Sequence, residues 1–339
     1  MNGEGTQASP YQVTTADEFI EAIQQDKAYV EILNDLDFNN SKYWNIKTKT
    51  SVPASSSSAY PEHAFELKCS NINGNNFKIS NIFMCDTNVL FLLYRSNTTV
   101  SIDNLIFEVI MLNYNKDYCS LFHTYINAFK ITFSNCDFRI KLNSVKDSQN
   151  LFTVGSNGCS YNWVNCIFNI DCYIYANITN NIFFNNGSST NIFRYCEFNI
   201  NIINNKKTSF GANVGYIFRS SYTFYFCPIF INVYNNIEAA NSQILMSIGY
   251  YQTKSILNNS YIIVQSKGAY PAKISFFDCN NYYFGCFNCN STCFYDIDIS
   301  TDLIYYNYTS SPITNLNRLT TEQCKDASYL NSIGFFVAE

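Results

Sequence analysis

The pattern that decides the fold reads ITFSNCDFRI at 131–140, YNWVNCIFNI at 161–170, NIFRYCEFNI at 191–200 and YTFYFCPIFI at 222–231. Apolar residues alternate with polar ones within each copy, and a period of two predicts β-strand. The alternation changes parity between Asn135 and Cys136, and at the same place in the other three copies. A parity change at a fixed place predicts a corner, where the chain turns while the same side stays inward.

Two landmarks recur along most of the chain. An aromatic or aliphatic column steps by 30 to 33 residues, through Phe77, Phe107, Phe138, Phe168, Phe198, Ile229, Tyr261 and Phe294. An apolar pair precedes most of its members, at 90–91, 121–122, 151–152, 182–183, 217–218 and 244–245. Near Tyr261 a second register, with Ile262 and Val264 inward, is equally compatible with the pattern. A period of about thirty residues indicates a repeat architecture. We therefore predict an all-β fold, a parallel β-helix solenoid of about eight coils, with phenylalanine stacked on phenylalanine inside.

Composition narrows the function classes. Only 14% of residues are charged, the net charge is −5, and no basic stripe follows the repeat, which argues against nucleic acid as a partner. No run of 18 apolar residues is present, so we expect no membrane insertion. The opening MNGEGTQASPYQ lacks the basic and apolar regions of a signal peptide, so we expect no secretory leader.

The fourteen cysteines admit two interpretations. One column holds Cys136, Cys166, Cys196 and Cys227, which we interpret as small buried hydrophobic residues. A second group, listed as Cys279, Cys286, Cys289 and Cys293, contains one C-x2-C pair that zinc sites use. The same stretch continues the coil pattern and lacks a second such pair. We therefore predict no metal site and no cofactor.

The ends differ from the repeats. Residues 14–25 predict a short amphipathic helix whose Thr15 and Glu18 fit a capping box. We expect residues 1–28 to form an N-terminal segment with this capping helix and 29–310 to form the β-helix, starting with a strand at 29–38. Residues 51–63 are expected to be an exposed loop. Residues 311–339 are expected to be a C-terminal cap or docking tail, with a helix at 320–332.

Both ends resemble known families. The opening YQVTTADEFIEAIQ (11–24) with YVEILNDLDFN (29–39) resembles the start of pectin-lyase-like proteins, which implies a right-handed β-helix. The ending LTTEQCKDASYLNSIGF (319–335) resembles the tail of GLUG-type bacterial adhesins and of gut-phage virion proteins, including crAss-like phages. The glycine-rich GLUG repeat is absent, and the tail stops at FFVAE instead of continuing. Neither end is a catalytic motif.

Candidate catalytic groups are few, and we assign no catalytic, cofactor-binding or metal-binding residue. Asp137 and Glu197 share one column two coils apart, roughly 10 Å, with Ile167 between them. Two further acidic groups, Asp35 with Asp37 and Asp296 with Asp298 and Asp302, alternate along strands. Each group is either a catalytic pair or a solvated strand face. The histidines, His63 and His123, have no nucleophile at a recognisable spacing.

Two surface groups complete the candidates. A sparse basic face would consist of Arg139, Lys141, Arg194 and Arg219. A tyrosine cluster, Tyr282, Tyr283, Tyr305, Tyr306 and Tyr308, would either stack on sugars or pack in the core or an interface.

Three functions fit these features to different degrees. The preferred one is a non-enzymatic virion protein of a phage, a fibre, spike or capsid-associated β-helix made in the host cytoplasm. It would self-associate as a homotrimer, contact other virion proteins and touch a host-surface glycan. A polysaccharide-degrading depolymerase needs a carboxylate cluster, and a cell-surface adhesin needs a secretion signal.

Overall fold

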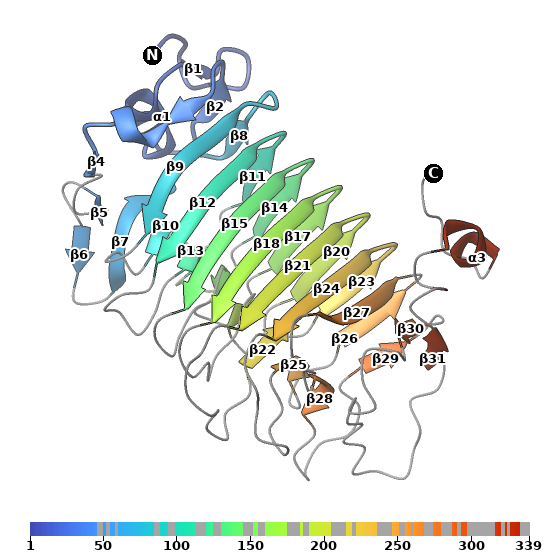
Figure 1. Ribbon diagram of the computed structural model, residues 1–339. Helices are drawn as coiled ribbons and strands as arrows, with labels where there is room; N and C mark the ends of the chain where they lie inside the picture. Colours follow the sequence, from blue (N-terminus) through green and yellow to red (C-terminus); the bar gives the residue numbers. More distant parts are fainter. Residues whose placement is uncertain are drawn as a thin grey trace.

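The structure is a computed structural model. It describes residues 1–45, 50–51, 55–57, 60–84, 89–93, 99–112, 120–124, 130–144, 152–154, 160–174, 184–185, 190–204, 215–218, 222–235, 246–250, 255–258, 260–267, 274–278, 287–289, 293–296, 316–319, 323 and 326–332. Within these residues the fold is mostly parallel β-sheet, stacked as a solenoid (Figure 1). The all-β parallel architecture predicted from the repeat is confirmed.

Three long sheets run along the stack. The ten-stranded sheet contains β1 (Tyr11–Val13), β2 (Tyr29–Ile32), β8 (Asn71–Asn73), β11 (Thr99–Asp103), β14 (Lys130–Ser134), β17 (Ser160–Val164), β20 (Thr190–Arg194), β23 (Tyr222–Tyr225), β26 (Ser255–Asn258) and β29 (Phe287–Cys289). The eight-stranded sheet contains β3 (Leu36–Asp37), β9 (Lys78–Met84), β12 (Ile106–Leu112), β15 (Asp137–Ser144), β18 (Ile167–Ile174), β21 (Glu197–Asn204), β24 (Pro228–Asn235) and β27 (Tyr261–Lys267). The six-stranded sheet contains β6 (Ser55–Ser57), β7 (Tyr60–Glu66), β10 (Val89–Leu93), β13 (Ser120–Thr124), β16 (Phe152–Val154) and β19 (Phe184–Asn185).

Smaller elements complete the described chain. A three-stranded parallel sheet contains β22 (Gly215–Phe218), β25 (Met246–Tyr250) and β28 (Ile274–Asp278), and β30 (Cys293–Asp296) pairs in parallel with β31 (Leu316–Leu319). The antiparallel pairs are β4 (Trp44–Asn45) with β5 (Thr50–Ser51), and β6 with β7. The helical elements are α1 (Ala16–Ile23), η1 (Phe38–Asn40) and α3 (Ala327–Ser332). None of the described helices is long and apolar enough to cross a membrane.

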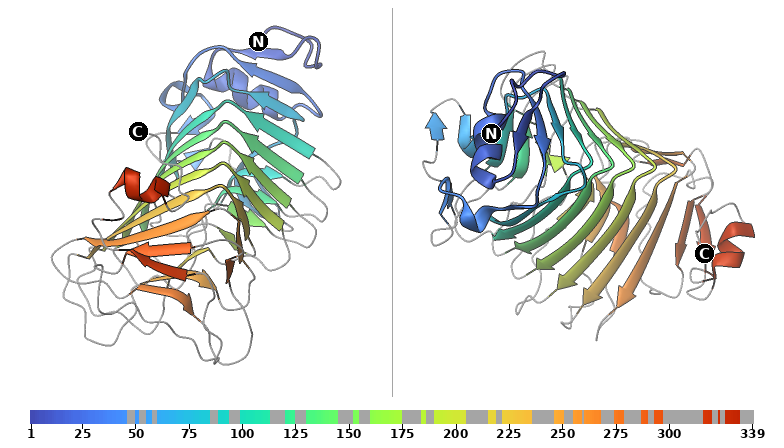
Figure 2. Two further views of the ribbon diagram at one scale, coloured as in Figure 1. Left: turned by 90° about the vertical axis from the view of Figure 1, so that its right-hand side faces the viewer. Right: turned by 90° about the horizontal axis from the view of Figure 1, so that it is seen from above.

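A sharp corner joins the ten-stranded and eight-stranded sheets in each central coil (Figure 2). One residue makes the turn in the left-handed backbone region, and the successive corner residues are Asn104, Asn135, Asn165, Tyr195 and Phe226, with φ between 52° and 55°. The corner keeps the ladder intact, because Asn135 N donates to Val164 O at 2.9 Å and Asp137 N to Leu105 O at 3.0 Å. This single left-handed residue is the physical cause of the parity change in the sequence.

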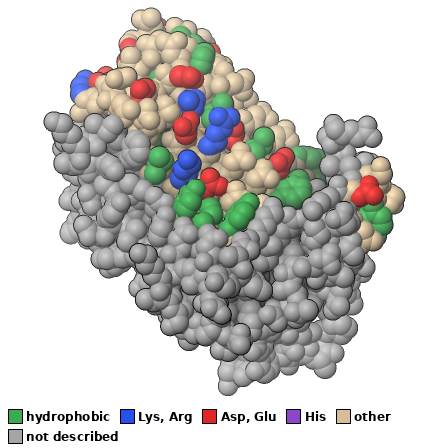
Figure 3. All heavy atoms as spheres, in the orientation of Figure 1, with side chains coloured by type: hydrophobic (Ala, Val, Ile, Leu, Met, Phe, Trp, Pro, Cys, Tyr) green, Lys and Arg blue, Asp and Glu red, His purple; other side chains and the backbone are tan. Residues whose placement is uncertain are grey.

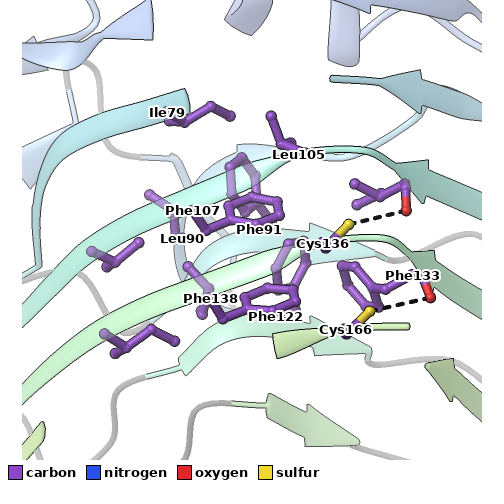
Figure 4. Close-up of a cluster of buried hydrophobic side chains, with 14 of the residues drawn as sticks. Ile79, Leu90, Phe91, Leu105, Phe107, Phe122, Phe133, Cys136, Phe138 and Cys166 are labelled. Carbon is purple, nitrogen blue, oxygen red and sulfur yellow. Dashed lines mark hydrogen bonds between the residues drawn. The ribbon is translucent and has the colours of Figure 1, made fainter. Parts of the chain in front are cut away.

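The interior is built from aromatic columns. Phe138 stacks on Phe107 at 4.9 Å and on Phe168 at 5.1 Å, with ring planes 6° and 7° apart. A second column, from the ten-stranded sheet, meets it edge-on, since Phe133 and Phe138 lie 5.5 Å apart at 75°. Such stacked and T-shaped pairs are the favourable arrangements of aromatic rings. Figure 4 shows Phe107 and Phe138 of the first column, Phe133 of the second, and the adjoining Cys136 and Cys166.

The cysteine column is also inside, as predicted. Cys136, Cys166, Cys196 and Cys227 are free and buried. The thiol of Cys136 donates to Ile102 O at 3.4 Å, and that of Cys166 to Phe133 O at 3.5 Å (Figure 4). Burial raises the pKa of the Cys136 thiol well above its usual range. These thiols therefore act as small packed side chains.

Two members of the predicted phenylalanine column were wrong. Ile79, and not Phe77, pairs with Phe107, and Phe77 only packs against the core from a partly buried position. The register of β9 shifts next to Asn81, which has φ 59°. At the other end Ile262, and not Tyr261, pairs with Ile229, so the alternative register is the correct one. Phe294 lies in β30, and its place in the column stays a prediction.

Three other expectations are refined. Phe184, and not Phe183, pairs with Phe152 in the six-stranded sheet. Residues 51–63 are not simply an exposed loop, because Ser55–Ser57 and Tyr60–Glu66 are strands β6 and β7. The cysteine column continues into Ser260, which is buried and whose Oγ accepts a hydrogen bond from Cys227 N at 3.0 Å.

The N-terminal segment covers the first coil (Figure 1). Helix α1 occupies part of the predicted 14–25 helix and buries Phe19, Ile20 and Ile23. Thr15 is the N-cap, and its Oγ1 accepts from Glu18 N at 3.2 Å. The Glu18 carboxylate accepts from Thr14 N at 2.8 Å, so the capping box closes one residue earlier than in the standard pattern. At the other end of the chain α3 lies within the predicted 320–332 helix.

Candidate functional site

The outward face of the eight-stranded sheet carries the polar side chains that the interior excludes. Figure 3 shows acidic and basic side chains gathered over this face, with hydrophobic ones beside them. Successive strands stack in register here, since Arg139 pairs with Asn169 and Asn169 with Asn199. Outward side chains therefore form rows along the solenoid axis, spaced at roughly 4.8 Å.

The acidic side chains of this face are bound to neighbours. Asp137 accepts from Arg139 at 2.8 Å, and Glu108 lies 3.2 Å from the Lys78 ammonium. These groups are partly exposed, and surface ion pairs of this kind contribute on the order of 0–1 kcal/mol. Their effect is mainly to neutralise the carboxylates in place.

Asparagine side chains and the carboxylates of Asp137, Glu197 and Asp171 form two hydrogen-bonded ladders. In the first, Asn169 donates to Asp137 at 3.3 Å, and Asn199 donates to Asn169 at 3.1 Å. Asn199 also lies 2.8 Å from Glu197, as a donor to its carboxylate.

The second ladder runs beside the first. Asn201 donates to Asp171 at 2.9 Å, and Asn232 donates to Asn201 at 3.0 Å. Each primary amide has two N–H donors and a carbonyl acceptor. A ladder amide therefore retains groups that can face a hydroxyl-rich ligand. We call the residues Asp137, Asn169, Asp171, Glu197, Asn199, Asn201 and Asn232 the amide ladders.

The candidate carboxylate pair lies where the sequence predicted. Asp137, Ile167 and Glu197 occupy one column on successive strands. Ile167 is 40% exposed, so an apolar side chain separates the two acids at the surface. Asp35 and Asp37, the acidic candidates of the first coil, are part of the described chain. Asp35 accepts from Lys78 N at 2.9 Å and Asp37 from Asn39 N at 2.9 Å, which are local structural bonds.

Several predicted residues lie elsewhere. Arg139 and Lys141 are exposed on β15, whereas Arg194 ends β20 in the ten-stranded sheet, so the expected basic face is split between two sheets. Asp296, Cys289 and Cys293 are in strands β29 and β30, and His63 and His123 are in β7 and β13. The remaining candidates lie outside the described residues: Asp298, Asp302, Arg219, Cys279, Cys286, Tyr282, Tyr283, Tyr305, Tyr306 and Tyr308. Within the described part of the chain, no three acidic, histidine or cysteine side chains are grouped to hold a metal ion.

The amide ladders were missed by the sequence reasoning. Their signal was present, because Asn169 and Asn199 are 30 residues apart, and so are Asp171 and Asn201. In so asparagine-rich a chain that signal is weak without the register. In comparisons with protein-family models, curated proteins and solved structures, nothing matched this chain.

Proposed function

We propose that the chain is a non-enzymatic structural or attachment protein of a phage virion, built as a right-handed β-helix of about eight coils. The amide ladders are the observation that carries this proposal. They present carboxylate and amide groups at regular intervals on an exposed, ordered sheet face. Such groups hydrogen-bond hydroxyls, which suits contact with a surface glycan.

The state of the carboxylates supports binding over catalysis. Hydrolysis of a glycosidic bond needs one carboxyl group as acid and another as base or nucleophile. Here Asp137 is bound to Arg139 and Asn169, and Glu197 is bound to Asn199. Both acids hold neighbouring side chains in position, which is the role expected of a recognition surface.

A direct test combines binding with product analysis. The full chain is applied to a panel of bacterial capsular and surface polysaccharides, and bound polymer and released reducing ends are both measured. We expect binding without product release. Asn199→Ala and Asn201→Ala should each weaken binding, whereas Lys130→Ala, on the neighbouring sheet, serves as the matched control. Equal binding by all three variants would show that the amide ladders do not bind the glycan.

The virion assignment has its own test. Purified phage particles are digested, and peptides of this chain are sought by mass spectrometry. Their presence at a stoichiometry comparable with other tail or capsid proteins is the expected result. Detection only in infected-cell lysate, and not in particles, would contradict a virion role.

A second function, a polysaccharide depolymerase, is favoured by one observation. Asp137 and Glu197 flank Ile167 in a single column, two strand spacings or roughly 10 Å apart. That separation is close to the upper end of the range for inverting hydrolysis. Release of reducing ends that disappears in Asp137→Asn and Glu197→Gln would establish this function instead.

A further inference from the structure

The corner between the ten-stranded and eight-stranded sheets changes character along the solenoid. Three successive corner residues are asparagines, linked as Asn165 to Asn135 at 3.3 Å and Asn135 to Asn104 at 3.1 Å. The next two corners hold Tyr195 and Phe226, whose rings stack at 5.2 Å with planes 9° apart. A polar ladder therefore gives way to an aromatic one.

The aromatic residues are costly at these positions. Both have φ 55°, a region where asparagine is tolerated and a bulky side chain is an outlier. Tyr195 is 59% exposed and Phe226 is 47% exposed, so burial in this chain offsets little of the backbone cost. Backbone strain that no local contact offsets is a reason to look for a function of the strained residues.

Exposed apolar side chains concentrate at this corner. Of the four large hydrophobic residues exposed among the described positions, two are Tyr195 and Phe226 at this corner, and the others are Ile167, at the start of β18, and Met1. We call Tyr195 and Phe226, whose rings stack on each other, the corner patch. Aromatic anchors of this kind dominate the energy of protein interfaces, and contiguous exposed apolar groups mark such sites.

Opposite charges flank the patch. Arg194 ends β20 on the ten-stranded side, and its guanidinium lies over the Tyr225 ring, 5.4 Å from the centroid. Glu197 begins β21 on the eight-stranded side. A cation therefore stands on one side of the Tyr195 corner and an anion on the other.

We propose that the corner patch is a self-association surface, where a second copy of this chain docks with its solenoid axis parallel to the first. This inference rests on the proposed function, because the homotrimer expected from the sequence belongs to that virion protein. When two corners meet with parallel axes, the ten-stranded side of one copy faces the eight-stranded side of the other. Arg194 then faces Glu197 of the second copy. Antiparallel axes would oppose Arg194 to itself, so charge favours the parallel arrangement.

The same contact serves two copies about a twofold axis or three about a threefold axis, because both place unlike sides together. The aromatic pair of each copy is removed from water at the centre, and the charge pairs lie at its rim. This is the division between an apolar core and a polar rim that protein interfaces show.

The first test replaces the aromatic corners with the residue of the preceding coils. Tyr195→Asn combined with Phe226→Asn extends the asparagine ladder and relieves the backbone cost, so the fold should remain as stable or become more stable. Sedimentation equilibrium should show that self-association weakens more than about tenfold. Thermal unfolding of the same samples checks the fold. An unchanged association constant in a folded variant overturns the proposal.

The second test uses charge. Arg194→Glu and Glu197→Arg should each weaken self-association, because each leaves like charges facing one another. The double variant, Arg194→Glu with Glu197→Arg in one chain, should associate again, because every contact then pairs an anion with a cation whether two or three copies meet. Lys130→Glu, an exposed residue at the start of β14, is the control and should leave association unchanged. A folded double variant that stays dissociated contradicts the parallel arrangement.

The outcomes separate this inference from the proposed function. A wild-type chain that is monomeric at all concentrations removes both self-association and the interface. If the wild-type chain forms an oligomer and the corner variants form it equally well, only the proposed interface is ruled out. Glycan binding and virion content are measured on the wild-type chain and on the Tyr195→Asn, Phe226→Asn variant, because Glu197 also belongs to the amide ladders.

Discussion

Asn135 donates its side-chain amide to Oδ1 of Asn104 at 3.1 Å, and both residues occupy the same left-handed corner of successive coils. The side chain and the backbone thus favour asparagine for separate reasons. Asparagine tolerates positive φ better than other non-glycine residues, and its amide can donate to one coil while accepting from the next. Substitutions at the corner can therefore measure how much the side-chain hydrogen bonds and the backbone conformation each stabilise the fold.

Replacing Asn135 separates those two contributions. Asn135→Ala removes the bonds to Asn104 and Asn165 and leaves at φ 53° a residue that tolerates positive φ less well than asparagine, so we expect a loss of about 1–3 kcal/mol. Asn135→Gly removes the same bonds without that strain and should cost less. Denaturant unfolding of both variants measures the difference. A glycine variant less stable than the alanine variant would contradict a left-handed corner.

The phenylalanine column should respond strongly to truncation. Phe138 contacts Phe107, Phe168, Phe133 and Trp163, so Phe138→Ala should cost about 3–5 kcal/mol. Phe138→Leu keeps more of the volume and should cost clearly less. Urea unfolding followed by tyrosine and tryptophan fluorescence provides the measurement, with exposed Lys130→Ala expected within about 0.5 kcal/mol of wild type. A small effect of the alanine variant would place Phe138 outside the core.

The buried thiols of Cys69, Cys136 and Cys172 should be chemically silent in the native state. Burial raises the pKa of Cys69 and of Cys172 to about 12, and the thiolate is the reactive form. We expect neither residue, nor Cys136, to react with a maleimide until the chain is unfolded. Peptide mapping after labelling with and without denaturant identifies each site. Rapid native labelling of Cys172 would show that the stack opens there.

Glu18 should make α1 sensitive to acid. Hydrogen bonds from the Met1 ammonium and from Thr14 lower the pKa of Glu18 from 4.5 to about 2. Because the folded-state pKa is depressed, the stabilisation is fully present above about pH 4.5 and disappears as pH falls toward 2. Glu18→Gln should therefore melt below wild type at pH 7.

The pH series supplies the control for that comparison. The difference in melting temperature between Glu18→Gln and wild type should shrink as pH falls from about 4.5 toward 2, because Glu18 is protonated first in the unfolded chain and, near pH 2, in the folded chain as well. A gap that stays constant from pH 7 to pH 2 would mean that the charge of Glu18 does not stabilise the folded chain.

The central coils could be predicted from sequence because side-chain parity and the coil period agree there. Phe107, Phe138, Phe168 and Phe198 are all inward, and each is followed by its partner after a step of 30 or 31 residues. Inward and outward alternation along a strand is a direct property of the backbone, so a repeat that preserves it reveals the fold.

The prediction failed where the coil length changed. Tyr261 is the aromatic residue at the spacing of the column, yet the buried Ser260 takes the cysteine place and Ile262 pairs with Ile229. Near Phe77 a left-handed residue, Asn81, shifts the register of β9. A single added residue reverses every side chain that follows, and composition alone does not locate it.

The candidate site was harder to predict than the fold. The column of Asp137, Ile167 and Glu197 followed from spacing, whereas the bonds of Asn169 and Asn199 to that column required lateral register between coils. The exposed Tyr195 and Phe226 were visible as aromatic residues at a corner otherwise held by asparagine. Their significance depends on solvent exposure, which a sequence pattern of inward and outward positions does not quantify.

The stacking of like residues on like residues has a consequence for how such a chain can change its length. Duplication or loss of one complete unit between Phe107 and Phe198 would place phenylalanine against phenylalanine again at the junction. Each such event would move the far end by one strand spacing, roughly 4.8 Å, and would require no new kind of core contact. The number of coils thus sets the length of the molecule, and recombination can change the distance between its two ends in steps of one strand spacing.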